Sequence, residues 1–211
     1  MNRKTLLTLG AACLLAFTAA TTFAQTTSAD ATTVKGTPYL NEAYVDGTIL
    51  FANNTRNAPI RYNAHKDLIE YTAGGVARVL DPNSSIKRVN FGENTFVVEK
   101  YKDDDVTKYG YFTVLDSGKA ILYSKKAVKF QPVLKGRAMD GGDQPAEYKR
   151  LPDAFYFRVN GGEMIQVRNI KSLIAAFPDK NDELSAFAKK EKISPRNEAE
   201  LIKLIEYYNS L

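Results

Sequence analysis

The chain has 211 residues, of which 25% are charged and 44% are hydrophobic, and its formal net charge is +5. A chain of this length can bury a core of its own as one domain. Its lysines are spread along the sequence with acidic residues near most of them, so it lacks the dense basic stripe typical of nucleic-acid-binding proteins. We therefore exclude nucleic acid as a partner.

The first 24 residues have the parts of a cleavable secretory signal. Arg3 and Lys4 form a basic start, a short apolar run follows, and the small residue Ala24 precedes the polar Gln25. The apolar run is shorter than the roughly 20 residues that a membrane-spanning helix needs. We expect cleavage after Ala24 and export to the periplasm or the outer membrane. Cleavage would leave 187 residues with a net charge of +3, because two basic and no acidic residues depart.

The single cysteine, Cys13, lies inside this apolar run. We expect it to leave with the signal, so the mature chain would have no disulfide, thiolate metal site or cysteine nucleophile. The alternative is a lipoprotein that is acylated at Cys13. This is disfavoured because Gly10 stands three residues before the cysteine, where a lipobox has leucine. No second long apolar run follows, so we expect no transmembrane segment in the mature chain.

Residues 25–35 are small, polar and without periodicity, and predict a flexible leader. Residues 36–211 then predict a single α+β domain, β-rich over 36–168 and helical over 169–211. In the β-rich part, turn signals recur at roughly the 8–12-residue spacing of consecutive antiparallel strands. We expect a mostly antiparallel, hairpin-linked sheet of about ten strands. The turn signals are Asp46-Gly47, a polar loop from Ala52 to Pro59, Gly74-Gly75, Asp81-Pro82-Asn83, Gly92-Glu93-Asn94, Asp103-Asp104-Asp105, Asp116-Ser117-Gly118 and Asn160-Gly161-Gly162.

Two short stretches give the most specific structural expectations. Asp46-Gly47 lies between two apolar runs and predicts a tight hairpin. The stretch "TFVVEKY" places Phe96 and Val98 on one face of a strand and Val97 and Tyr101 on the other. Because apolar residues occur on both faces here, we expect parts of both faces of the sheet to be covered.

The last part of the chain changes to helical periodicity and predicts two to three helices. Asn169 is a plausible N-cap for the first, Asp179 or Asn181 for the second, and Ser194 for the third. The apolar stripes favour packing on the sheet over docking of another protein. They comprise Ile170, Leu173, Ile174 and Phe177, then Leu184 and Phe187, then Leu201, Leu204, Ile205 and Tyr208.

The only histidine, His65, lies in the stretch "RYNAHKDLIEY". The segments on either side read as strands, so we expect His65 to lie in a short solvated link between them. Zinc binding would need further histidine or cysteine ligands, which the mature chain lacks. Catalysis with a serine would need a nucleophile on a defined turn, and no G-x-S-x-G motif occurs. His65 is therefore not assigned a catalytic role.

Two acidic groups have functional alternatives. Asp103, Asp104 and Asp105 favour a charged hairpin tip, although a weak calcium site with Asp140 and Asp143 stays open. Glu70 and Glu99 could form a glycosidase-type acid/base pair if they converge in a cleft. The spacing of these residues matches no ion-binding loop, so we assign no catalytic, cofactor-binding or metal-binding residue.

Three stretches together resemble a family of uncharacterised exported proteins of Gram-negative bacteria. They are "RYNAHKDLIEY", "YGYFTVLDSGKAILYSKK" and "FPDKNDELSAFAKKEKISPRNEAELIKLIEYYNSL", which ends in a Tyr-Tyr-Asn signature. The resemblance spans about residues 36–211. It implies export and a β-rich body with a helical end, and it carries over no functional residue.

Three hypotheses of function follow. The first is a non-enzymatic envelope protein that binds a protein partner or the cell surface. The alternative is a periplasmic carrier of a lipid or other apolar ligand, which predicts one cavity lined by phenylalanines. The third, an enzyme, predicts two acids converging in a cleft, and we rank it last. The expected cavity residues are Phe51, Phe91, Phe112, Phe130 and Phe157.

Overall fold

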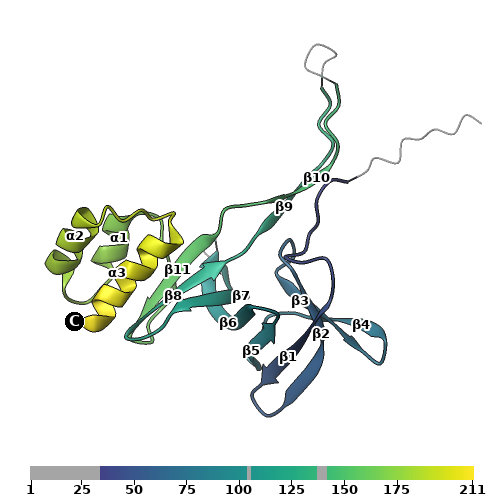
Figure 1. Cartoon of the computed structure of the whole chain (residues 1–211), viewed down its shortest axis with the longest axis horizontal. Coiled ribbons are helices and arrows are strands. Elements are labelled where there is room, and N and C mark those ends of the chain that lie inside the picture. Colours follow the sequence, from purple (N-terminus) through teal and green to yellow (C-terminus); the bar gives the residue numbers. More distant parts are fainter. Residues whose placement is uncertain (1–33, 104–105, 137–141) are drawn as a thin grey trace, which may run out of the picture. The chain divides into compact units, whose positions relative to one another are not determined.

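The computed structural model describes residues 34–103, 106–136 and 142–211 (Figure 1). These residues belong to one compact unit, Thr32–Leu211. The expected signal with Cys13, most of the leader, and Asp104, Asp105 and Asp140 lie outside the described residues. Within them, a ten-stranded antiparallel sheet is followed by three helices, which confirms the predicted α+β class.

The strands are β1 (Val45–Phe51), β2 (Thr55–Asn63), β3 (Leu68–Ala73), β4 (Val76–Leu80), β5 (Ile86–Phe91), β6 (Asn94–Asp103), β7 (Val106–Asp116), β8 (Ala120–Lys125), β9 (Val128–Gln131), β10 (Glu147–Arg150), β11 (Ala154–Val159) and β12 (Ile165–Gln166). The helices are α1 (Ile170–Ala175), α2 (Asn181–Lys190) and α3 (Glu198–Ser210).

The large sheet has the order β12-β11-β8-β7-β6-β5-β1-β2-β3-β4. Two runs of consecutive hairpins, β1 to β4 and β5 to β8, meet where β5 pairs with β1. β11 returns beside β8 and pairs with β12. Strands β9 and β10 form a separate two-stranded ribbon, and Lys35 makes a parallel bridge to Glu147 beside it. The ribbon is a feature that the sequence pattern did not predict.

The hairpin expected at Asp46-Gly47 is wrong, because both residues lie inside β1. β1 is paired on both sides, with β2 and with β5. A Cβ atom on Gly47 would lie 2.3 Å from the backbone oxygen of Asn90 on β5. Glycine is therefore needed here for close approach of a neighbouring strand, and not for a turn.

The polar loop expected from Ala52 to Pro59 is also wrong in its extent. The connection covers residues 52–54 only, because β2 begins at Thr55 and pairs with β1 from there.

Side-chain alternation sends successive residues of β6, β7, β8 and β11 into different clusters. Along β11, Phe155 and Phe157 join a cluster under the helices, which we call the helix-side core, while Tyr156 joins an aromatic cluster on the opposite face. This confirms that both faces of the sheet are partly covered. The aromatic cluster consists of Tyr101, Phe112, Tyr123, Tyr156 and Met164.

Strands β1 to β7 enclose a third cluster, which we call the N-terminal core. It is filled by large rings: Tyr62 and Phe96 are fully buried, and their centroids lie 4.7 Å apart. Tyr111 meets Phe96 edge-on at 6.5 Å. Such aromatic contacts stabilise a core beyond the area that the rings bury.

The helices cover one face of β8 and β11, as predicted. Leu201, Leu204 and Ile205 of α3 are completely buried in the helix-side core. Among the described residues, no helix is long and apolar enough to cross a membrane.

The expected helix caps are right at one of three positions. The Asn169 side chain accepts a hydrogen bond from the Ser172 backbone and caps α1, as predicted. Lys180 precedes α2 in the left-handed conformation without a side-chain cap. The cap of α3 is Asn197 and not Ser194, because Ser194 begins a turn ahead of the helix and donates its backbone N–H to Glu200.

Asn209 ties the end of α3 to the sheet. Its side-chain oxygen accepts from the Ala120 backbone N–H at 2.8 Å, and its Nδ2 donates to the Ala120 carbonyl at 3.0 Å and to Asp116 at 3.2 Å. The neighbouring Tyr208 donates its hydroxyl to Asp179. The Tyr-Tyr-Asn ending therefore has a structural role in docking the helix.

We expect Asn209→Ala to lower the free energy of unfolding by about 1–3 kcal/mol, because it leaves the buried backbone groups of Ala120 without partners. Urea denaturation measures this change. The control is Glu206→Ala on the exposed side of the same helix, which should change stability by less than about 0.5 kcal/mol. Equal effects of the two substitutions would contradict this role of Asn209.

Candidate functional site

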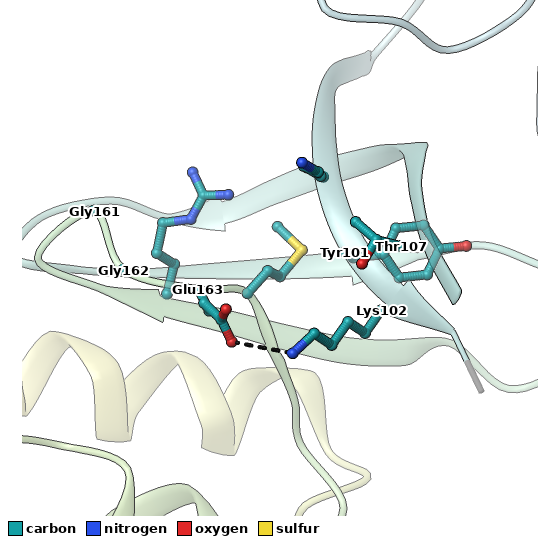
Figure 2. Close-up of a pocket in the computed structure, with 9 residues that line it drawn as sticks. Tyr101, Lys102, Thr107, Gly161, Gly162 and Glu163 are labelled. Carbon is teal, nitrogen blue, oxygen red and sulfur yellow. Dashed lines mark ion pairs between the residues drawn. The ribbon is translucent and has the colours of Figure 1, made fainter. Parts of the chain in front are cut away.

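The candidate site is a pocket of about 560 Å³ that lies between the β6–β7 hairpin and the turn joining β11 to β12 (Figure 2). Lys100, Tyr101 and Lys102 come from β6 and Arg158 comes from β11. Met164, which follows the β11–β12 turn, lies beside Tyr101 in the aromatic cluster. The pocket thus combines basic side chains with an apolar wall.

Arg158 is held in place by Glu99. Its Nη2 donates to a Glu99 carboxylate oxygen at 2.7 Å, and the other oxygen accepts from the Tyr123 hydroxyl at 3.2 Å. Both charged side chains are only about one fifth exposed, at 20% and 21%. Burial, followed by the negative charge of Glu99, raises the pKa of Tyr123 to about 12. Tyr123 therefore stays a hydrogen-bond donor at neutral pH.

The opposite side of the pocket is more open. Lys102 and Glu163 face each other there, 3.6 Å apart, with side chains 62% and 81% exposed (Figure 2). An exposed pair at this distance contributes little stability and can separate easily. Thr107 adds a hydroxyl to the lining.

A buried ion pair lies next to the pocket, behind Tyr101. Lys125 of β8 donates to Asp67 in the β2–β3 turn at 2.5 Å, and its ammonium lies 4.6 Å from the centre of the Phe112 ring. The other Asp67 oxygen accepts from the Tyr62 hydroxyl at 2.7 Å. Burial lowers the pKa of Lys125 despite the opposing charge of Asp67. Asp67 also accepts from the Tyr111 backbone N–H at 3.2 Å, so the pair joins the β2–β3 turn to β7 and β8.

Gly110 makes room for this ion pair. A Cβ atom at this position would lie 2.7 Å from the Lys125 Nζ, 2.8 Å from the Tyr101 ring and 2.9 Å from the Asp67 carboxylate. Contacts below 3.0 Å force neighbours to move. The absence of a side chain at Gly110 therefore permits the Asp67–Lys125 contact.

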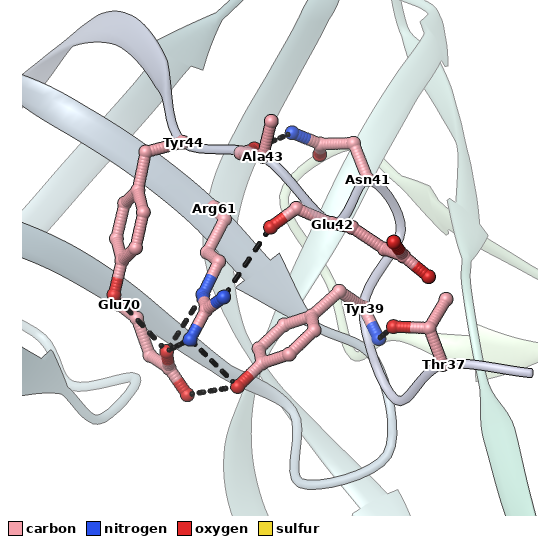
Figure 3. A network of polar contacts seen from close by, with 8 residues as sticks. All are labelled: Thr37, Tyr39, Asn41, Glu42, Ala43, Tyr44, Arg61 and Glu70. Carbon is pink, nitrogen blue, oxygen red and sulfur yellow. Dashed lines mark hydrogen bonds and ion pairs between the residues drawn. The ribbon is translucent and has the colours of Figure 1, made fainter. Parts of the chain in front are cut away.

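A second polar network fastens the segment that precedes β1 to the sheet (Figure 3). The Arg61 guanidinium donates to Glu70 from Nε at 2.8 Å and from Nη2 at 2.6 Å. It lies 3.7 Å from the ring centre of Tyr39 and 4.4 Å from that of Tyr44. Cation–π contacts on both rings, together with the ion pair, hold these two tyrosines against β2 and β3.

Glu70 and Glu99 do not converge. Glu70 is on β3 and pairs with Arg61, whereas Glu99 is on β6 and pairs with Arg158. Strands β5, β1 and β2 separate them in the sheet. Each carboxylate is neutralised by its own arginine, so the expected acid/base pair is not assembled.

His65 lies in the link between β2 and β3, as predicted. His65 also makes contacts within the protein, which the sequence did not predict. The His65 Nδ1 lies 3.1 Å from the Val128 carbonyl oxygen, and its ring meets the Tyr148 ring edge-on at 5.4 Å. His65 therefore contacts both strands of the β9–β10 ribbon.

The candidate calcium residues are used in other ways where the structure describes them. Asp103 pairs with Lys108 at 2.6 Å, and Asp143 pairs with Lys135 at 2.8 Å. Asp104, Asp105 and Asp140 fall outside the described ranges. Within those ranges, no three histidine, cysteine or acidic side chains form a group that could hold a metal ion.

The five phenylalanines expected around a ligand cavity are distributed over separate regions. Phe91, Phe112 and Phe157 are buried in the N-terminal core, the aromatic cluster and the helix-side core respectively. Phe51 is partly buried at the edge of the N-terminal core, and Phe130 on the ribbon is 37% exposed. They do not line one cavity.

The sequence predicted neither the pocket nor the Asp67–Lys125 ion pair. Their residues come from strands that are neighbours only after the sheet forms, and no short motif connects them. One signal was available: Lys100, Lys102 and Lys108 flank the β6–β7 turn, but lysines at a hairpin tip more often protect a strand edge.

No protein-family model, curated protein or solved structure matches the chain.

We expect Glu70→Gln to destabilise the protein by about 1–3 kcal/mol at pH 7, because Arg61 loses its charged partner. Burial alone would raise the pKa of Glu70, but the hydrogen bond and charge of Arg61 outweigh it and lower the pKa. This stabilisation is therefore present above the unfolded pKa of about 4.3 and is lost as the pH falls through the folded pKa.

Urea denaturation from pH 7 to pH 3 tests this expectation. The difference between wild type and Glu70→Gln should shrink below about pH 4.3. Glu206→Gln, on the exposed side of α3, serves as the control. A difference that stays constant to pH 3 would mean that packing, and not the charge of Glu70, is lost.

Proposed function

We propose that this is an exported, non-enzymatic binding protein of the cell envelope, and that a partner protein adds an extended strand to the open edge of β4. The secretory pattern of residues 1–24 supports export. The observation that carries the binding proposal is the state of β4, which is hydrogen-bonded to β3 alone among the described strands.

The two ends of the large sheet differ. At one end, β12 has only two residues, a length that protects an edge against further pairing. At the other end, β4 has five residues, of which four are exposed, and carries one charge, that of Arg78. Val76 and Val79 are 57% and 58% exposed. An apolar edge of this length is a ready template for another strand.

The pairing register of β3 and β4 shows which backbone groups of β4 can bind a further strand. Gly74 and Gly75, both with positive φ, form a two-residue turn, so Ala73 and Val76 are the hydrogen-bonded pair that flanks it. Hydrogen-bonded and non-hydrogen-bonded pairs then alternate along an antiparallel ladder. Ala77 and Val79 are consequently the residues whose N–H and C=O groups point away from β3. These groups can bind an extended peptide.

The same features favour a protein partner over catalysis or a small apolar ligand. Strand addition takes its affinity from main-chain hydrogen bonds, here those offered by Ala77 and Val79, and its specificity from alternate side chains of the added strand. An enzyme using Glu70 and Glu99 would need these carboxylates together, and each pairs with a different arginine. The phenylalanines expected around a ligand cavity lie in separate clusters, so they do not support the carrier alternative.

We expect Val79→Pro to weaken partner binding at least tenfold (about 1.4 kcal/mol or more), because it removes an outward N–H and places a ring on the open edge. The bonds between β3 and β4 should persist, since Val79 does not donate to β3. Val79→Ala keeps the N–H and is the matched control. The measurement is the affinity of the purified full chain for its co-purifying envelope protein.

Co-purification by itself is not support, since the test is the difference between proline and alanine. Thermal unfolding should show both variants folded. Equal binding by Val79→Pro and wild type would exclude the β4 edge as the binding surface. A second copy of the chain as the only strand bound there would overturn the proposal of a partner protein.

The intact mass of protein purified from its own cell envelope tests export. We expect a mass that begins at Gln25, after removal of residues 1–24. A mass that begins at an acylated Cys13 would show a lipoprotein and contradict the expected cleavage. An uncleaved chain recovered from the cytoplasm would contradict export.

A further inference from the structure

We propose that the pocket of Figure 2 binds a small organic anion, with its carboxylate or phosphate group held by Arg158 and Lys100 and a short apolar part against Met164 and Tyr101. The inference concerns a different surface from the β4 edge, and it does not depend on strand addition there.

The charge of the lining favours an anion. Among the described residues that line the pocket, Lys100, Lys102 and Arg158 are basic and Glu163 is acidic. Glu99, which pairs with Arg158, adds a second negative charge beside the lining. Glu163 is 81% exposed and lies at the more open side, so its charge is well screened by solvent. Three basic side chains against two acidic ones leave a surplus of one positive charge, which would attract a negative group that enters between Arg158 and Lys100.

The Arg158 guanidinium is already oriented before an anion binds. Its hydrogen bond to Glu99 fixes the guanidinium through Nη2, and Tyr123 fixes Glu99 in turn. The Nε atom of Arg158 is buried and has no hydrogen-bond partner among the described residues. A guanidinium that is already oriented loses little conformational freedom on binding, and its planar donors match carboxylate and phosphate oxygens.

The size and the apolar wall limit the rest of the ligand. About 560 Å³ lies within the range of roughly 300–1,000 Å³ that is common for small-molecule sites. Met164 and Tyr101 are 8% and 5% exposed and present a thioether and an aromatic ring. A Cβ atom on Gly161 would meet nothing within 4 Å, so the rim is open there. A compact ring or short chain beside the anion fits this space.

The experiment uses the full exported chain and four probes: benzoate, phenyl phosphate, inorganic phosphate and benzyl alcohol. Calorimetry measures affinity, and amide chemical shifts of Gly161, Gly162 and Lys102 locate the binding. We expect benzoate or phenyl phosphate to bind with shifts at these amides, and the tighter of the two identifies the anionic group. Benzyl alcohol should not bind, and inorganic phosphate should bind at least fivefold more weakly than phenyl phosphate.

Four variants separate the contributions. Arg158→Gln should weaken binding about tenfold, and Lys100→Gln about threefold without disturbing a buried ion pair. Glu163→Gln should strengthen binding about twofold, because it removes the opposing charge at the rim. Lys149→Gln, on exposed β10, is the control for overall charge and should leave affinity unchanged.

Three results would overturn the inference. The first is equal binding of benzyl alcohol and benzoate, which would show that charge is irrelevant. The second is an equal loss in Lys149→Gln and Lys100→Gln, which would show non-specific attraction. The third is the absence of shifts at Gly161, Gly162 and Lys102 at millimolar benzoate or phenyl phosphate. Loss of folding in Arg158→Gln would leave Lys100→Gln and Glu163→Gln, with opposite expected signs, as the decisive pair.

Discussion

Alternation of side chains along β6, β7, β8 and β11 is the constraint on which the rest of the structure depends. Each of these strands must supply apolar residues to both faces, as Leu122 and Tyr123 do on β8. The helices can cover one face of β8 and β11 only because Ala120, Leu122, Phe155 and Phe157 stand together there. The opposite face is filled by aromatic rings, and the pocket lies where this filling ends, beside Tyr101 and Met164.

Partly buried charges join parts of the sheet that the ladder hydrogen bonds do not. Lys125 on β8 meets Asp67 in the β2–β3 turn, and Arg158 on β11 meets Glu99 on β6. Removing one member of a buried pair costs more than the pair contributes, because the other charge is left unpaired. These contacts therefore fix the relative placement of strands. They also occupy carboxylates that could otherwise act in acid/base chemistry.

The fold was largely predictable from the sequence, because the deciding signals are local. Turn residues such as Gly74-Gly75 separate strands, and the stripe containing Leu201, Leu204 and Ile205 packs on the sheet. The hairpin predicted at Asp46-Gly47 is wrong, because the same dipeptide serves either a tight turn or a close strand contact. Only the partner strand, which contributes the Asn90 oxygen, decides between the two.

The candidate site was not predictable, because its chemistry depends on pairing over long sequence separations. Lys100 and Arg158 lie on strands whose order in the sheet follows from β8 pairing with β11. The sequence offers Glu99 as a candidate acid, and only the folded sheet shows that it pairs with Arg158. The ribbon of β9 and β10 was missed for the same reason, since its short strands pair across a long connection.

The docking of α3 through Asn209 has a consequence for the order in which the protein folds. The Ala120 backbone pairs with the Asn209 side chain, which lies 89 residues further along the chain and after all twelve described strands. The hairpins β1 to β4 and β5 to β8 have their partners early, and local pairings of this kind form fastest. One face of β8 and β11, with Leu122 and Phe157, stays uncovered until α3 docks. Until then this apolar face is exposed surface through which folding intermediates can aggregate.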